Sequence, residues 1–81
     1  MTATTDQDLS RTVYTLIQAG PTTEPIAIQA LNRDVIFKVS VGAPGADDAG
    51  HFLEQGDLVS ITLLVGEDLY AKGGKIAKTG G

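Results

Sequence analysis

The chain has 81 residues, enough for one small domain and too few for two. Its 10 acidic and 6 basic side chains give a net charge of −4, which disfavours binding to the phosphate backbone of nucleic acids. Because cysteine is absent, disulfides, thiolate metal sites and cysteine nucleophiles are excluded. The apolar runs are far shorter than the ~20 residues that cross a membrane. We therefore expect one acidic domain that binds neither nucleic acid nor membrane.

Residues 1–10 form a polar segment in which Leu9 is the only sizeable apolar residue after Met1. Terminal segments of this composition are usually loose unless a neighbour orders them. We predict a flexible N-terminal arm over residues 1–10 and a single β domain over residues 11–81. If the arm orders on a neighbouring subunit, Asp6, Asp8 and Leu9 are its candidate interface residues.

The segment from residue 9 to residue 19 fits two structures. Leu9, Val13 and Leu16 follow a helical spacing, and Gly20 with Pro21 would end a helix. The segment is also rich in β-branched and aromatic residues, which favour a strand. We prefer the strand and keep the helix as the alternative.

Three segments alternate apolar and polar residues, as half-buried strands do. Residues 26–31 place Ile26, Ile28 and Ala30 on one side. In residues 35–41 the apolar side carries four residues, and in residues 58–65 it carries another four. Those side chains are Val35, Phe37, Val39, Val41, Val59, Ile61, Leu63 and Val65.

Strand starts near residues 12, 25, 35, 58, 68 and 75 are separated by Gly, Pro, Asn and Asp. Gly73-Gly74 is a typical two-residue turn of a β-hairpin. This spacing predicts an all-β fold, a small antiparallel β-sandwich or barrel of about six to seven strands.

Residues 42–56 make a loop that is long for a domain of this size, and such loops often carry contacts or function. Phe52 and Leu53 either close the open end of the core or face a partner, and closing the core is the preferred interpretation. Tyr14 and Tyr70 lie opposite the apolar faces of their strands, where exposed tyrosines suit interfaces. We add Tyr14, His51, Phe52 and Tyr70 to the candidate interface residues.

The sequence offers little catalytic chemistry, and we predict that the protein is not an enzyme. Its one histidine, His51, has no serine in a nucleophile-elbow context beside it. Asp47, Asp48, His51 and Glu54 do not have the spacing of a calcium loop. No glycine pattern for a phosphate or dinucleotide occurs. We therefore assign no catalytic, cofactor-binding or metal-binding residue and expect no cofactor.

The central half of the chain resembles small β-sandwich virion structural proteins of tailed bacteriophages. The resemblance lies in the order of elements from residue 35 to residue 73. A strand is followed by a proline-containing loop, a Gly-x-x-Leu-x-x-Gly-acid turn, a second strand, and an aromatic strand that ends in a glycine turn. The matching positions are Pro44, Gly50, Leu53, Gly56, Asp57, Tyr70 and Gly73.

The resemblance implies a capsid decoration or cement protein, made in the host cytoplasm, that binds the outside of a phage head. Its partners would be the major capsid protein or another virion protein, and copies of itself, with a trimer favoured. The alternatives are a tail or head-completion component and a free cytoplasmic ligand-binding β module. The resemblance transfers no catalytic residue.

Overall fold

The chain folds as an all-β protein whose computed structural model describes residues 4–45 and 48–80. Within these residues there are eight strands and no helix. The strands are β1 Thr4–Asp8, β2 Thr15–Ala19, β3 Ile26–Ala30, β4 Val35–Ser40, β5 His51–Leu53, β6 Leu58–Ile61, β7 Asp68–Lys72 and β8 Lys75–Gly80.

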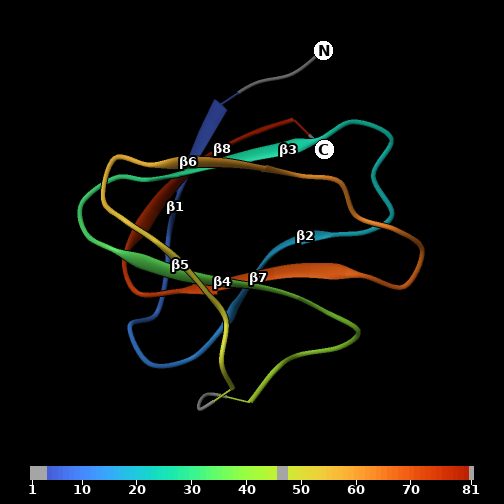
Figure 1. Cartoon of the computed structure of the whole chain (residues 1–81), viewed down its shortest axis with the longest axis horizontal. Coiled ribbons are helices and arrows are strands. Elements are labelled where there is room, and N and C mark those ends of the chain that lie inside the picture. The colour runs from blue at the N-terminus through green and yellow to red at the C-terminus, as the bar shows by residue number, and fades with distance from the viewer. Residues whose placement is uncertain (1–3, 46–47, 81) are drawn as a thin grey trace.

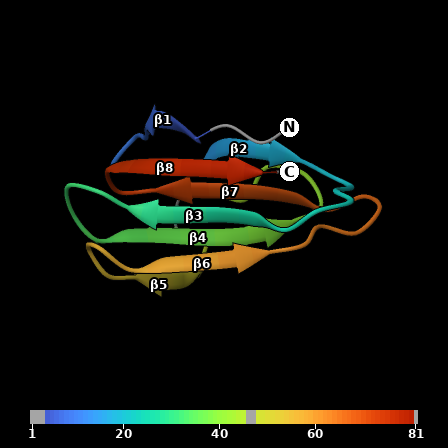
Figure 2. The same cartoon turned by 90° about the horizontal axis from the view of Figure 1, so that it is seen from above.

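The strands form two antiparallel sheets of four strands each. We call them the β8 sheet, with the order β1-β8-β3-β6, and the β7 sheet, with the order β2-β7-β4-β5. Figure 1 shows the two layers edge-on, and Figure 2 shows β6 and β5 along one side with β1 and β2 along the other. This order is that of an eight-stranded jelly roll. The predicted all-β sandwich is confirmed, with β1 and β5 as strands that the sequence did not reveal.

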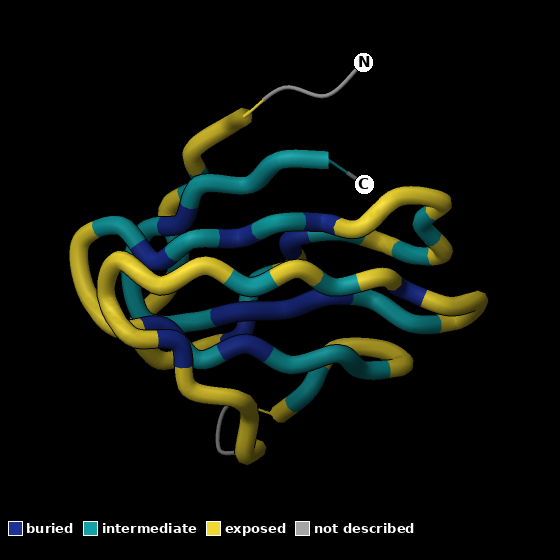
Figure 3. The backbone as a smooth tube through the Cα atoms, turned by 45° about the horizontal axis from the view of Figure 1, so that its top comes forward, coloured by how far each residue is buried: buried dark blue, intermediate teal, exposed yellow. Residues whose placement is uncertain are grey.

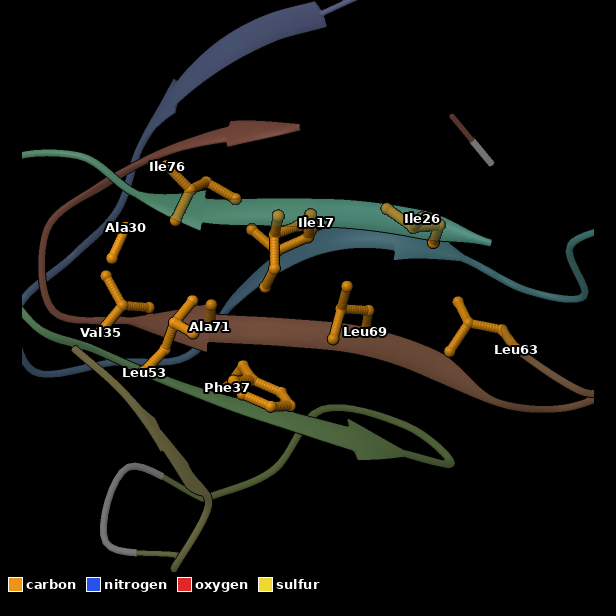
Figure 4. Packing of buried hydrophobic residues seen from close by; sticks show 11 residues of the cluster. Ile17, Ile26, Ala30, Val35, Phe37, Leu53, Leu63, Leu69, Ala71 and Ile76 are labelled. Carbon is orange, nitrogen blue, oxygen red and sulfur yellow. The ribbon is translucent and has the colours of Figure 1, made fainter. Parts of the chain in front are cut away.

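The core lies between the sheets and includes several of the side chains that alternation predicted to face inward (Figure 4). Ile26, Ile28 and Ala30 of β3 are fully buried, and Val35 and Phe37 of β4 face them from the other sheet. The remaining buried members of the cluster are Ile17, Leu53, Leu63, Leu69, Ala71 and Ile76.

Two residues expected on these inner faces lie outside the core because their strands end before them. Val41 follows the last residue of β4 and is 81% exposed. Val65 lies four residues after the end of β6, in the connection to β7, and is 86% exposed. Once the chain turns away from its neighbouring strand, alternation no longer determines which side a residue faces.

The connection between β7 and β8 is not the predicted hairpin. β7 pairs with β2 and β4, whereas β8 pairs with β1 and β3, so Gly73 and Gly74 carry the chain from one sheet to the other. Backbone hydrogen bonds join this arch to its neighbours: Gly73 N donates to Ser10 O at 2.8 Å, and Leu31 N donates to Lys75 O at 2.9 Å. Gly73 passes close to the backbone of Asp34, just before β4. This close approach requires glycine, because a Cβ at Gly73 would lie 2.8 Å from Asp34 O.

The segment predicted as a loose arm contains an edge strand, although its first three residues lie outside the described part. β1 pairs with β8 over five residue pairs, from Thr4 with Thr79 to Asp8 with Lys75. Gln7 also donates from Nε2 to Leu16 O at 3.2 Å, across to the other sheet. The polar composition did not indicate β1, because the strand is held mainly by backbone pairing, which any non-proline residue provides.

Within residues 9–19 the structure has a strand over Thr15–Ala19 and no helix, as preferred. β2 pairs with β7, and a bulge between Leu16 and Gln18 shifts the register. Ile17 is buried in the core, and Leu16, its neighbour on the opposite side of the strand, is 47% exposed.

Candidate functional site

The seven candidate interface residues do not lie on one surface. Asp6 and Asp8 are exposed on the edge strand β1, and Leu9 is partly buried against the core. His51 is exposed on β5, with its ring centroid 5.2 Å from that of Phe37. The other three candidates, Tyr14, Phe52 and Tyr70, belong to the outer side of the β7 sheet.

Register places two rows of side chains across this outer side. Leu16 lies opposite Tyr70, which lies opposite Lys38. In the next row Ile36 lies between Lys72 on β7 and Phe52 on β5. We call the apolar part of this surface the tyrosine face. It comprises Leu16, Ile36, Phe52 and Tyr70, together with Tyr14, whose ring lies beside Lys72.

Both tyrosines face outward, as alternation predicted, but they are buried and not exposed. Tyr14 is 6% and Tyr70 8% accessible. Lys72 Nζ lies 4.7 Å from the centre of the Tyr14 ring, a distance that suits a cation–π contact. The two tyrosines are therefore packed within the tyrosine face and offer little accessible surface. Its accessible apolar residues are Phe52, which is 62% exposed, and Leu16.

Asp48, in the connection between β4 and β5, is held against the tyrosine face. The Tyr14 hydroxyl donates to the carbonyl oxygen of Asp48 at 2.9 Å. Gly45 N donates to Asp48 Oδ2 at 2.9 Å, and Lys38 Nζ lies 3.7 Å from the same oxygen. A Cβ at Gly50 would approach the backbone oxygen of Phe37 to 2.7 Å and the Tyr14 hydroxyl to 2.6 Å, so the close packing there requires glycine. This packing explains why Tyr14 is buried despite its outward direction.

Burial raises the pKa of Tyr14 above its ordinary value of 10.0, and the nearby Asp48 carboxylate raises it further. Both effects disfavour the phenolate. At neutral pH the hydroxyl is therefore protonated and acts as a hydrogen-bond donor, which is the role that its contact with Asp48 requires.

Phe52 and Leu53 have different surroundings, although closing the core was the preferred interpretation for both. Leu53 is 6% accessible and belongs to the core cluster, whereas Phe52 points to the opposite side of the same strand. Both lie in β5, a strand of three residues that pairs with β4. The alternation of even a short strand separates neighbouring side chains onto different faces.

Neither a metal cluster nor a pocket occurs among the described residues. Of the acidic loop residues considered as calcium ligands, Asp47 lies outside the described residues, and Asp48 binds Gly45 and Lys38 as stated above. In that part of the chain, moreover, there is no helix with the length and apolar character needed to cross a membrane.

Sequence reasoning did not include Leu16, Ile36 and Asp48 in the candidate surface. The sequence could have indicated Ile36, because it is the apolar residue on the otherwise polar side of its strand. Leu16 is directed outward by the alternation of β2, where it lies opposite Tyr70, and Asp48 acts through a loop conformation. Comparison of the chain with protein-family models, curated proteins and solved structures gives no match.

Proposed function

We propose that the protein is a structural component of a bacteriophage particle, a decoration protein that binds the outside of the head. In this proposal the tyrosine face contacts the major capsid protein. This role requires a rigid docking surface, and it requires no catalytic or cofactor-binding residue.

The tyrosine face is the observation that carries the proposal. Interfaces are enriched in aromatic residues, and their strongest contacts are aromatic side chains that enter a pocket of the partner. Phe52 is 62% exposed, and it sits beside Ile36 on a sheet whose outer side is already packed by two buried tyrosines. Such a preordered surface loses little side-chain freedom on binding, which favours affinity.

The jelly-roll topology supports the proposal more weakly. The same strand order occurs in viral capsid domains, but also in lectins and in cupins, so topology alone does not select a function. The resemblance of residues 35–72 to phage virion proteins is what favours the viral setting among these.

Particle attachment tests the proposal. Virus particles made in cells that express the gene are banded on a density gradient, and immunogold electron microscopy locates the protein on them. We expect it to copurify with the particles and to label the head surface. Label restricted to the tail would support the head-completion or tail alternative, and absence from every particle fraction would refute the virion role.

A variant pair identifies the docking surface. Phe52→Ser should lower the affinity for particles at least about tenfold, since central aromatic anchors contribute about 2 kcal/mol or more. Val65→Ser is the control because Val65 is 86% exposed and is not part of the tyrosine face. Equal binding by the two folded variants would exclude Phe52 as an anchor.

A further inference from the structure

The two open sheets leave four edge strands: β1 and β6 in the β8 sheet, and β2 and β5 in the β7 sheet. An edge strand presents unpaired backbone groups that can pair with another chain. Natural proteins prevent such pairing with charged side chains, bulges, prolines or very short edge strands. An edge without these features is therefore a candidate interaction surface.

Three of the four edges are protected in one of these ways. β1 carries the exposed acids Asp6 and Asp8. β2 has the bulge between Leu16 and Gln18. β5 is only three residues long.

β6 has four residues and carries no charged side chain, proline or bulge. Residues 58–66 contain no charged residue and no proline, in a chain in which 20% of residues are charged. β6 pairs with β3 from Leu58 to Ile61 without a register shift. Its residues alternate between exposed and intermediate along the strand (Figure 3), and Leu58 is 61% exposed.

The backbone groups available on this edge follow from the hydrogen bonds on either side of the strand. Ala30 N donates to Asp57 O at 3.1 Å, and Thr22 N donates to Leu63 O at 3.1 Å. In antiparallel pairing, successive residues direct their backbone groups alternately toward and away from the partner strand. The odd-numbered residues of β6 therefore form backbone hydrogen bonds with the neighbouring chain on the β3 side. The N–H and C=O groups of Leu58, Ser60 and Thr62 point away from β3, toward the open edge of the sheet.

The hydrophobic core is also incomplete beside β6. Val59 and Ile61 lie opposite the fully buried Ile28 and Ile26, and they pack against the core, yet each is only partly buried. No strand of the described chain covers their outer flank in the β8 sheet. A further strand paired with β6 would cover it.

We propose that β6 pairs with β6 of a second copy of this chain, antiparallel and about a two-fold axis at Ser60. Side chains directly opposite in an antiparallel pair lie on the same face, so an axis at Ser60 uses all three outward-directed residues. Val59 then lies opposite Ile61 of the second copy, which extends both cores, and Leu58 lies opposite Thr62 on the outer side. Because residues 58–66 are uncharged, two chains of net charge −4 can approach each other there.

This pairing closes with two copies, since each partner uses the same edge. It therefore differs from the trimer implied by the resemblance to virion proteins, and it does not depend on the virion role. A peptide arm from another protein is the competing occupant of the edge.

Light scattering and amide hydrogen exchange of the full chain, each over a concentration series, test the proposal. We expect a mass twice that of the chain and exchange at Ser60 and Thr62 that slows as concentration rises. Val59 and Ile61 should be protected throughout, because their amides already face β3. A monomer or a trimer at every concentration, or a dimer without this change, would overturn the proposal.

Proline substitutions provide matched variants. Ser60→Pro removes an outward N–H without breaking a bond to β3, and prolines are tolerated at such edge positions. Asp6→Pro is the control, because Leu9 N donates to Gly74 O and the same alternation directs the Asp6 N–H away from β8. We expect a monomer for Ser60→Pro and a dimer for Asp6→Pro, each with its fold checked by circular dichroism.

Ser60→Lys covers the case in which Ser60→Pro does not fold. It keeps the N–H but puts like charges opposite each other at the axis, so it should weaken the dimer at least tenfold and salt should restore part of the affinity. A folded Ser60 variant with unchanged affinity would overturn the proposal.

Discussion

Replacing Gly73 with asparagine tests whether β7 and β8 are joined by an arch between the sheets. In a hairpin the resulting Asn-Gly turn would be favourable. In the arch, Gly73 has φ of +126°, and its Cβ would lie 2.8 Å from Asp34 O and 3.2 Å from Val35 Cα. The two connections therefore predict opposite effects of the same substitution on stability.

Two costs set the size of the expected effect in the arch. The positive φ costs a residue with a side chain about 1–2 kcal/mol. The contact with Asp34 and Val35 adds about 1–3 kcal/mol, because these are backbone atoms that cannot rotate away. The total, about 2–5 kcal/mol, approaches the whole stability of a small domain.

Urea unfolding of Gly73→Asn and of a control, Gly42→Asn, measures the effect. Gly42 also has a positive φ, +84°, but its Cβ would meet nothing within 4 Å. The control should therefore lose only about 1 kcal/mol, for the backbone conformation. Equal losses in the two variants would refute the close crossing at Gly73, and a gain in Gly73→Asn would indicate a hairpin.

Three further substitutions test the core and two polar contacts. Phe37→Ala should cost about 3–5 kcal/mol in urea unfolding, and Phe37→Leu much less; an unchanged midpoint for Phe37→Ala would contradict the core assignment. Tyr14→Phe should cost about 1 kcal/mol at neutral pH. Because the pKa of Tyr14 in the folded chain lies above its ordinary value of 10.0, the unfolded chain loses the phenolic proton first as the pH rises. The free energy of unfolding of the wild type should therefore fall as the pH rises above 10. Tyr14→Phe should lack this part of the fall. Lys78→Met removes the hydrogen bonds from Nζ to Ile17 O and Gln18 Oε1, each 3.1 Å, and should cost about 1–3 kcal/mol, whereas Lys78→Arg should retain most of the stability.

Alternation along the sequence predicted the inner strands of the sandwich well. Ile26, Ile28 and Ala30 are buried as expected, and so are Val35 and Phe37. These strands have neighbours on both sides and a core on one face, so the local pattern carries the information that determines them.

The missing strands were hidden because pairing, and not composition, creates them. β1 depends on β8, about seventy positions further along the chain, and β5 has only three residues. Likewise, Gly73-Gly74 is compatible with a hairpin or an arch, and the choice depends on which strands flank β7 and β8. Tyr14 was oriented correctly but judged exposed, because its cover comes from the loop around Asp48.

The two proposed surfaces are compatible, and together they predict how dimerisation affects attachment. Directly opposite residues of an antiparallel pair share a face, so a β6-paired dimer would turn both tyrosine faces to the same side. A dimer of this kind could contact a repetitive shell through two sites, which raises the apparent affinity without any new contact. Ser60→Pro should therefore weaken particle binding although its tyrosine face is intact, whereas Phe52→Ser should weaken binding and remain dimeric. If Ser60→Pro proved monomeric yet bound particles as tightly as the wild type, the two surfaces would not act together.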